Sequence, residues 1–126
     1  MCEIKEMLGK TLVKIEGGKK DDCEMNMYFS DGTAYSFYHN QYCCEDVSIE
    51  DVCGKLENLI GNPLLMAEDV TEHAHLPKRH EKLHKYDDPY TYTFYKFATI
   101  KGYVTVRWYG TSNGYYSEEV DFRRIK

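Results

Sequence analysis

The sequence predicts an α+β fold, with an antiparallel sheet of about six strands and one short helical element in a single compact domain. Runs rich in Val, Ile, Thr, Tyr and Phe recur along the chain and are separated by turns that contain Gly. One stretch instead has apolar residues three and four positions apart, as in a helix. The chain has 126 residues, 42% of them hydrophobic, so it is long enough for one core and too short for two ordinary domains. We therefore assign residues 1–126 to one domain.

The first strands are predicted between residues 11 and 39. Residues 11–16 alternate in polarity like a half-buried strand, and Gly17-Gly18 with the charged residues that follow ends it. Residues 24–29 and 33–39 are rich in aromatic side chains and flank Ser30-Asp31-Gly32. These two segments predict a β-hairpin.

A short helix is predicted within residues 47–60. Gly54 interrupts the pattern, which favours two helical turns over one continuous rod, and Gly61-Asn62-Pro63 ends it. Residues 64–70 resume as an extended stretch. The apolar residues that would share one face of this helix are Ile49, Val52, Leu56, Leu59 and Ile60.

The C-terminal half of the chain predicts a long loop followed by a meander. Residues 73–89 are polar, basic and irregular, which indicates a long loop within the domain. The meander turns at Lys101-Gly102 and at Ser112-Asn113-Gly114, where Asn and Gly tolerate positive φ. Its three strands are residues 90–100, 103–109 and 115–125.

The middle strand of the meander separates core residues from surface residues. Side chains of a strand alternate between two faces, so every second residue shares an environment. The predicted sets are Val104, Val106 and Trp108 for the core, and Tyr103, Thr105, Arg107 and Tyr109 for the accessible face.

Charge restricts the partners that the chain can take. The formal net charge of −5 argues against general nucleic-acid binding, which needs clustered Lys and Arg. Residues 45–72 carry eight acidic side chains against one basic side chain, Lys55, a local net charge of −7. The simplest interpretation of this acidic strip is solvated surface, and the functional one is docking on a basic partner.

Localisation and redox state are also predicted from composition. No apolar run approaches the ~20 residues needed to cross a bilayer, and the first residues lack the basic region and apolar stretch of a secretory signal. We therefore expect a cytoplasmic protein that does not bind membranes. The five cysteines are odd in number and include the adjacent Cys43 and Cys44, which favours reduced thiols over a disulfide framework.

An aromatic turn near the C-terminus is the strongest candidate for a recognition surface. Tyr and Trp give a large rigid contact area at little entropic cost, and polar neighbours orient a partner. Rings beside an arginine would also suit a planar, charged molecule such as a nucleotide. The residues predicted to bind a ligand or partner are Arg107, Tyr109, Ser112, Asn113, Tyr115 and Tyr116 in and beside the turn, with Glu45, Glu50 and Asp51 from the acidic strip.

A second candidate site combines one imidazole with three thiols. His39, Cys43, Cys44 and Cys53 have the inventory of a Cys₃His zinc site. Adjacent cysteines rarely chelate one ion comfortably, and cysteine is often buried as a small apolar residue. A structural role for these thiols, a zinc site and a nucleophilic Cys-His pair therefore remain open, and no other cofactor is predicted.

Three sequence blocks resemble a family of small phage and bacterial proteins that is filed as a domain of unknown function. The blocks are H-x-x-x-C-C-E at residues 39–45, I-E-D-x-C-G at residues 49–54 and R-W-Y-G-x-S-N-G-Y-Y-S at residues 107–117. The resemblance implies a phage, prophage or bacterial accessory protein, and it brings no established activity. The resemblance supports a functional hypothesis by analogy alone.

The leading functional hypothesis is a non-catalytic binding protein. It would engage a host protein, or sequester a nucleotide-like small molecule, and so interfere with bacterial defence or regulation. One alternative is a metal- or thiol-dependent enzyme centred on His39, Cys43 and Cys44. The other is a structural or oligomer-forming module whose tyrosines pack against copies of itself.

Overall fold

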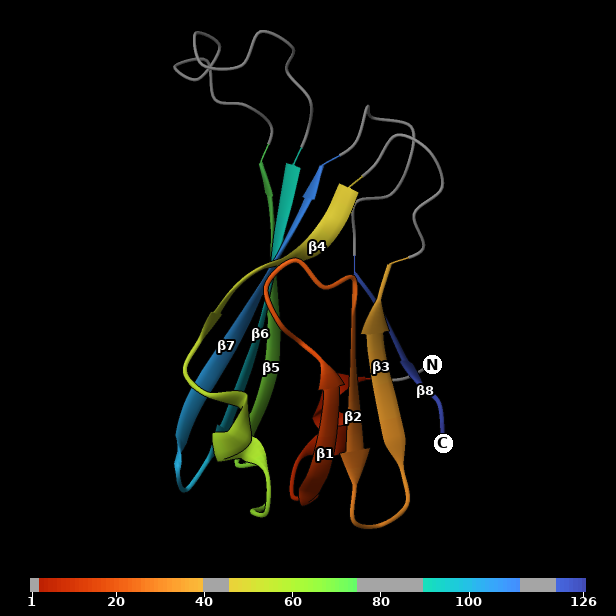
Figure 1. Ribbon diagram of the computed structural model, residues 1–126, viewed down its shortest axis with the longest axis vertical. Helices are drawn as coiled ribbons and strands as arrows, with labels where there is room; N and C mark the ends of the chain where they lie inside the picture. The colour runs from red at the N-terminus through yellow and green to blue at the C-terminus, as the bar shows by residue number, and fades with distance from the viewer. Residues whose placement is uncertain (1–2, 40–45, 75–89, 112–119) are drawn as a thin grey trace, which may run out of the picture.

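The computed structural model describes residues 3–39, 46–74, 90–111 and 120–126, with two four-stranded antiparallel sheets. Figure 1 shows the two sheets on opposite sides of the molecule. Within the described residues the helical elements are two 3₁₀ turns of four residues each, and no helix there is long and apolar enough to span a bilayer. In sheet order, the first sheet consists of β1 (Leu12–Gly17), β2 (Glu24–Phe29), β3 (Ala34–Tyr38) and β8 (Asp121–Arg124). The second sheet consists of β4 (Asp46–Cys53), β7 (Gly102–Thr111), β6 (Tyr90–Thr99) and β5 (Met66–Ala74).

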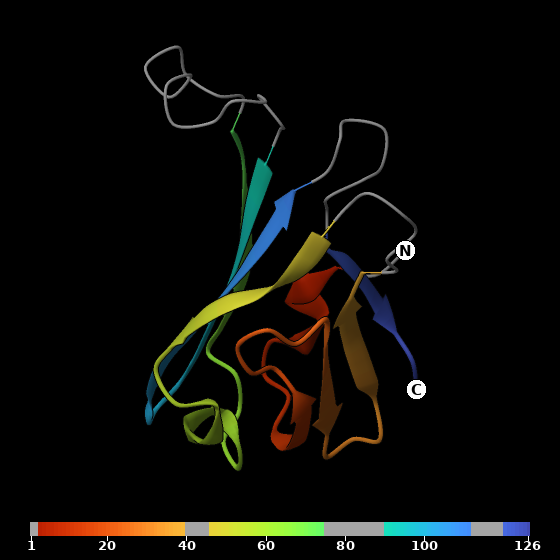
Figure 2. The same cartoon turned by 45° about the horizontal axis from the view of Figure 1, so that its top comes forward.

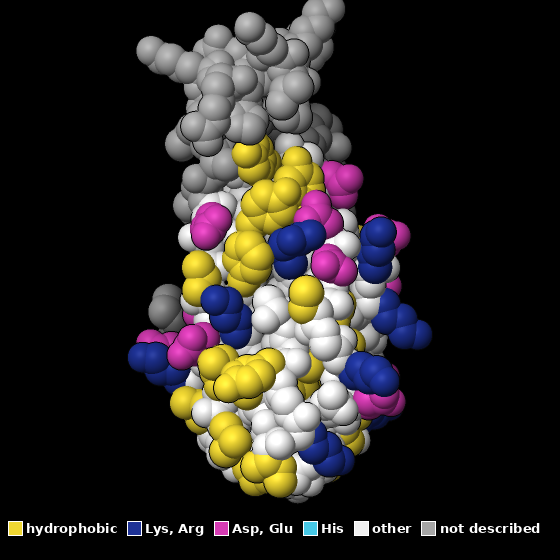
Figure 3. Space-filling model, turned by 90° about the vertical axis from the view of Figure 1, so that its left-hand side faces the viewer, with side chains coloured by type: hydrophobic (Ala, Val, Ile, Leu, Met, Phe, Trp, Pro, Cys, Tyr) yellow, Lys and Arg dark blue, Asp and Glu magenta, His cyan; other side chains and the backbone are white. Residues whose placement is uncertain are grey.

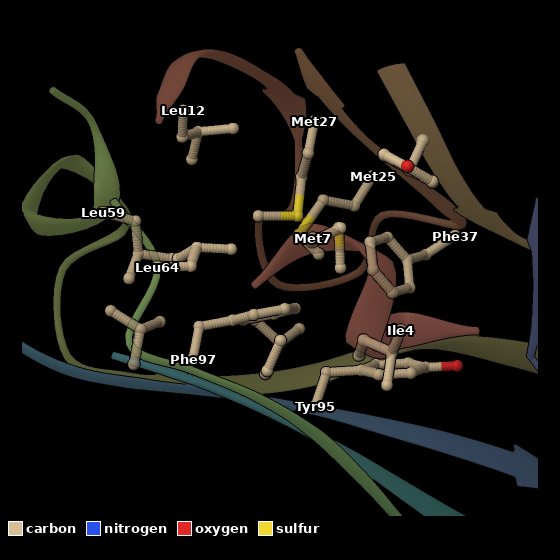
Figure 4. Packing of buried hydrophobic residues seen from close by; sticks show 14 of the residues in the cluster. Ile4, Met7, Leu12, Met25, Met27, Phe37, Leu59, Leu64, Tyr95 and Phe97 are labelled. Carbon is tan, nitrogen blue, oxygen red and sulfur yellow. The ribbon is translucent and has the colours of Figure 1, made fainter. Parts of the chain in front are cut away.

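The inner faces of the two sheets form one hydrophobic core. Phe37 on β3 reaches across to the second sheet, where its ring centroid lies 4.6 Å from that of Tyr95 and 6.0 Å from that of Phe97. Figure 4 shows these rings packed beside Met25, Met27 and other apolar side chains. Burial of this shared apolar surface is the main stabilising term that holds the sheets together.

The predicted hairpin of residues 24–39 is confirmed as β2 and β3, which pair antiparallel. The backbone N–H of Phe29 donates to the carbonyl of Thr33 at 2.9 Å and closes the turn. Asp31 accepts hydrogen bonds from the backbone N–H and the hydroxyl of Thr33, and it also forms an ion pair with Lys10 at 3.2 Å. The turn is thus fixed by the side chain that the sequence places at its start.

The helix predicted within residues 47–60 is wrong, because residues 46–53 form the strand β4. The register of β4 against β7 jumps between Ile49, which pairs with Trp108, and Asp51, which pairs with Arg107. The extra residue, Glu50, is a β-bulge, and it turns both Ile49 and Val52 toward the core. The three-residue step that imitated a helix is produced by this bulge. Farther on, Leu56 and Leu59 belong to the 3₁₀ turn η2 (Leu56–Leu59).

The three-stranded meander is confirmed only for its first two strands, β6 and β7. The described end of the third predicted segment is β8, which pairs with β3 in the other sheet and not with β7. Residues 112–119 lie outside the described residues. Two four-stranded sheets therefore replace the single sheet of about six strands that the sequence predicts.

Strand β5 completes the second sheet. Residues 66–70 of the predicted extended stretch 64–70 are confirmed as part of β5, which pairs with β6 over its whole length. The first two residues of the predicted loop 73–89 form the end of β5, and the remainder lies outside the described residues. A further element that the sequence did not predict, η1 (Ile4–Met7), buries Ile4 and Met7 in the core.

The connection between β1 and β2 covers the outer edge of β4. The N–H of Asp21 donates to the carbonyl of Ile49 at 2.7 Å, and the N–H of Ile49 donates to the carbonyl of Asp22 at 2.8 Å. Figure 2 shows β4 running beside β7 with this connection close to it. Two backbone hydrogen bonds therefore hold the residue that immediately precedes the bulge.

Candidate functional site

The side of β7 that points away from the core is the starting point of the candidate site. The predicted alternation is confirmed, because Val104, Val106 and Trp108 are at most 1% exposed. Arg107 and Tyr109 lie on the opposite side and are partly exposed. We use the term outer face for this side of the sheet formed by β4, β7, β6 and β5.

The first half of strand β6 adds further aromatic side chains to the outer face in an inverted burial pattern, whereas its second half buries Tyr95 and Phe97. Thr91 and Thr93 point inward and are 1% and 4% exposed, whereas Tyr92 and Phe94 point outward and are partly exposed. A half-buried strand ordinarily places its larger apolar residues inside. The inversion therefore leaves rings at the surface that could have been placed in the core.

The strand register brings these rings into one cluster. Tyr92 pairs with Tyr109 across the strands, and their ring centroids are 5.1 Å apart. Tyr90 lies 5.8 Å from Tyr92 and 6.0 Å from Tyr109, and Phe94 lies 6.2 Å from Tyr92. These separations are those of interacting aromatic pairs. We call Tyr90, Tyr92, Phe94 and Tyr109 the aromatic cluster.

Arg107 lies beside the aromatic cluster and is paired with two carboxylates. Its Nε is 2.8 Å from Oε1 of Glu50, and one terminal nitrogen is 3.9 Å from Oδ2 of Asp51. The Nε–H is not aligned on the carboxylate oxygen, so the contact with Glu50 is an ion pair and not a hydrogen bond. The guanidinium carbon also lies 5.8 Å from the ring centroid of Tyr92, within cation–π range.

The bulge explains how two neighbouring acidic residues reach one arginine. In a regular strand Glu50 and Asp51 would point to opposite sides of the sheet. Because two residues of β4 oppose one residue of β7 at the bulge, both carboxylates lie on the side of Arg107. The sequence predicted these three residues as site residues, and the fold brings them together.

The edge strands supply most of the charge on the outer face. Lys96 and Arg107 are the only charged residues that the register places there on the central strands, among the described residues. The apolar side chains of Val70 and Tyr103 extend the same surface and are 39% and 74% exposed. The acidic residues on this face are Asp46, Glu50 and Asp51 from β4 and Glu68 and Glu72 from β5.

Five carboxylates against two cations give the described outer face a net charge of −3. Figure 3 shows one view of the surface in which hydrophobic side chains gather next to acidic and basic ones. Charge of one sign on a surface favours partners of the other sign and repels those of the same sign.

Burial and nearby charge raise the pKa values of two tyrosines of the aromatic cluster. The pKa of Tyr92 is raised mainly by burial and then by the negative charge of Glu50, while Arg107 acts in the opposite direction. The pKa of Tyr109 is raised by burial first, and then by Tyr92 and Glu50. Both phenols therefore stay neutral at physiological pH and act as hydrogen-bonding, apolar contact surface.

Part of the predicted recognition surface lies outside the described residues. Among its members, Arg107, Tyr109, Glu50 and Asp51 are brought together on the outer face. The members outside the described residues are Ser112, Asn113, Tyr115, Tyr116 and Glu45. Sequence reasoning missed Tyr90, Tyr92 and Phe94, although their spacing of two residues was a usable signal that all three share one face of a strand.

The structure describes two members of the predicted zinc site. His39 is 8% exposed and follows β3 in the first sheet, whereas Cys53 is exposed at the end of β4 in the second sheet. His39 lines a cleft of about 230 Å³ together with Cys23, a cysteine that the sequence had not singled out. Cys43 and Cys44 lie outside the described residues. Within the part of the chain that is described, no three His, Cys, Asp or Glu side chains are grouped so that they could hold a metal ion.

Three clefts formed by described residues lie away from the aromatic cluster. One of about 370 Å³ lies between η1, β5, β6 and β8, and its lining includes Lys5, Asp69 and Phe122. Another, of about 320 Å³, lies beside the connection between β1 and β2. None of these three clefts is lined by Arg107 or by a residue of the aromatic cluster.

Comparison with known proteins places the chain in a family but assigns no activity. No curated protein and no solved structure matches the chain significantly. Residues 5–122 match a family described as a domain of unknown function, which confirms that part of the resemblance seen in the sequence. The match covers nearly the whole chain of 126 residues. The chain therefore belongs to the family Domain of unknown function (DUF7448).

Proposed function

We propose that this chain is a non-catalytic binding protein whose outer face docks on a partner protein. The observation that carries the proposal is the inverted burial on the first half of β6, where Thr91 and Thr93 are inside and Tyr92 and Phe94 are outside. Exposed Tyr, Phe and Arg side chains are the residue types that dominate binding energy at protein interfaces. The resemblance to small phage and bacterial proteins supports a phage or prophage setting, with a bacterial host protein of defence or regulation as the partner.

The charge of the outer face, and its position away from the three clefts, favour a protein over a nucleotide-like small molecule. Small-molecule sites are concave and bury most of the ligand, and the aromatic cluster lines none of the three clefts described above. A phosphate group would also have to compete with Glu50 and Asp51 for Arg107. The net charge of −3 on the described face repels an anion.

The same charge disfavours the oligomer-forming alternative through this face. In a symmetric dimer the same patch of both copies meets, so two surfaces of net charge −3 would face each other. Like charges at an interface cost binding free energy unless they are paired. A partner with a different surface therefore fits the face better than a second copy.

Affinity capture from a bacterial lysate tests the proposal. The immobilised wild-type protein is compared with Tyr92→Ser and with Tyr28→Ser, which removes a partly exposed tyrosine from the outer side of the first sheet. We expect a partner that the wild type and Tyr28→Ser retain and that Tyr92→Ser loses. Equal capture by both variants would contradict docking through the outer face.

A thermal-shift screen with nucleotides tests the small-molecule alternative in parallel. A ligand that binds only the folded state raises the melting temperature. We expect no shift at millimolar nucleotide. A shift that Tyr92→Ser abolishes would contradict the choice of a protein partner and favour the nucleotide hypothesis.

A further inference from the structure

We propose that the outer face recognises a positively charged segment of its partner, whose Arg and Lys side chains lie on the aromatic cluster and pair with the acidic residues of the two edge strands. This inference rests on the proposed function and specifies the chemistry of the partner. The occupant is a basic protein segment, in contrast to nucleic acid, a nucleotide or a second copy of this chain.

The arrangement of the sheet is the first argument. In the strand order β4, β7, β6, β5, the rings stand on the two central strands and the carboxylates on the two edge strands. Neighbouring strands are about 4.8 Å apart, so the acidic edges are separated by roughly 14 Å with the rings between them. A segment that lies over the central strands can therefore direct long cationic side chains to either edge.

Arg107 provides the second argument, because it already makes the contacts that are proposed for a partner. Its guanidinium lies 5.8 Å from the Tyr92 ring and its Nε lies 2.8 Å from Glu50. A cation over a ring with a carboxylate at its side is thus a stable arrangement on this surface. Tyr90 and Tyr109 offer further rings for which no cation–π contact with a described cation is found.

The charge balance provides the third argument. The positive charge of Arg107 offsets the negative charge of one of the two carboxylates beside it. Lys96 on β6 lies directly opposite Glu68 on β5 in the strand register. Asp46 and Glu72 are exposed at opposite edges of the aromatic cluster and add charge that these cations do not offset. The net charge of −3 therefore attracts a basic segment and accelerates its association at low ionic strength.

The tyrosines on the outer side of the first sheet differ from those of the aromatic cluster, because cations of this chain already cover them. Tyr28 has Lys14 and Lys126 each 5.5 Å from its ring centroid. Tyr38 likewise has Arg123 at 4.9 Å. These rings offer no comparable site for a cation from a partner, and they supply matched control positions.

Fluorescence anisotropy with synthetic peptides tests the inference. The probe is a labelled peptide of eight arginines, and a labelled peptide of eight glutamates is its control. We expect the arginine peptide to bind the wild-type protein, with an affinity that falls as salt is added. Tyr92→Leu should weaken binding about two- to fivefold, because it keeps an apolar side chain and removes the cation–π contact.

A pair of double variants separates the outer face from overall charge. Glu68→Gln with Glu72→Gln removes two charges from the face, and Glu24→Gln with Glu57→Gln removes two exposed charges elsewhere. We expect the double variant at Glu68 and Glu72 to weaken binding of the arginine peptide by at least about threefold. The double variant at Glu24 and Glu57 should weaken this binding clearly less. Tyr28→Leu should have no effect. The inference is overturned if the arginine peptide fails to bind at low salt, if the glutamate peptide binds equally, or if the two double variants weaken binding equally.

This result can be distinguished from a failure of the proposed function. Capture of a partner that depends on Tyr92, together with no binding of the arginine peptide, would overturn the basic segment and leave the docking face in place. Capture that is independent of Tyr92 would contradict the docking face itself.

Discussion

Arg107 of β7 and Glu50 of β4 form an ion pair, with 2.8 Å between Nε and Oε1, because β4 carries one residue more than β7 at that point. Without the bulge, Glu50 and Asp51 would lie on opposite sides of the sheet. The backbone of Asp21 and Asp22 is hydrogen-bonded to Ile49, which fixes the strand immediately before the bulge. A local irregularity of one strand therefore sets the charge pattern beside the aromatic cluster.

Replacing Glu50→Gln should lower the pKa values of Tyr92 and Tyr109. The Glu50 charge raises both pKa values, while burial, the larger cause, remains in the variant. Because Arg107 and Glu50 are 39% and 35% exposed, the free energy of unfolding should change by less than about 1 kcal/mol. Ring resonances of labelled tyrosine, followed by NMR as pH is raised, measure the effect. Unchanged pKa values would contradict the placement of Glu50.

The same raised pKa values predict sensitivity of the fold to alkali. The unfolded tyrosines titrate near the ordinary value of 10.0, and the folded Tyr92 and Tyr109 titrate above it. The stability that this difference contributes is fully present below pH 10 and is lost as pH rises through the folded values. Denaturant unfolding between pH 8 and pH 11 checks the sign. In the Glu50→Gln protein the decline with pH should be shallower.

Gly54→Ala should destabilise the protein more than Gly61→Ala. Both glycines have positive φ, 96° and 91°, so either substitution strains the backbone by about 1–2 kcal/mol. A Cβ on Gly54 would lie 2.4 Å from the carbonyl oxygen of Tyr103, whereas a Cβ on Gly61 meets nothing within 4 Å. Denaturant unfolding should show a loss for Gly54→Ala that exceeds the loss for Gly61→Ala by at least about 1 kcal/mol. Equal losses would contradict the close approach at Gly54.

Phe37→Ala should cost about 3–5 kcal/mol of the free energy of unfolding. Phe37 is fully buried and contacts rings of the opposite sheet, so its removal leaves a cavity between the sheets. That loss is a large part of the stability of a typical domain. Val13→Ala is the control, because Val13 is 52% exposed and should lose less than about 0.5 kcal/mol. A similar, small loss in both variants would mean that the two sheets do not share this core.

Because of Asp31, the free energy of unfolding should decrease as pH falls in the acidic range. Hydrogen bonds from Thr33 and the neighbouring Lys10 lower the pKa of Asp31 from 3.8 to about 2. The stability that this carboxylate contributes is present above pH 3.8 and is lost as pH falls through about 2. Asp31→Asn should therefore be less stable than the wild type at neutral pH, and the two should converge near pH 2. A difference in melting temperature that persists in strong acid would contradict this role.

The sequence predicted the fold best where local pattern and environment agree. The alternation of Val104, Val106 and Trp108 against Arg107 and Tyr109 identified both faces of β7. The turn at Asp31 identified the hairpin of β2 and β3. In both cases the pattern that reveals the element lies within a few consecutive residues.

Other elements were hidden because their causes are not local. The bulge at Glu50 changed the spacing of apolar residues in β4 from two to three, which imitates a helix. The partner of β8 is β3, more than eighty residues earlier in the chain, and no nearby turn indicates that pairing. In the first half of β6, rings alternate with small threonines, so periodicity alone does not decide that Thr93 is buried and Phe94 is partly exposed.

Site-specific photo-crosslinking tests the central claim, docking through the outer face, most directly. Benzoylphenylalanine in place of Phe94 puts a reactive group in the aromatic cluster, and in place of Tyr28 it puts the same group on the other sheet. After irradiation in a bacterial lysate, we predict a partner protein joined covalently at position 94 and not at position 28. Crosslinks of the same partner at position 28 with none at position 94 would contradict the account.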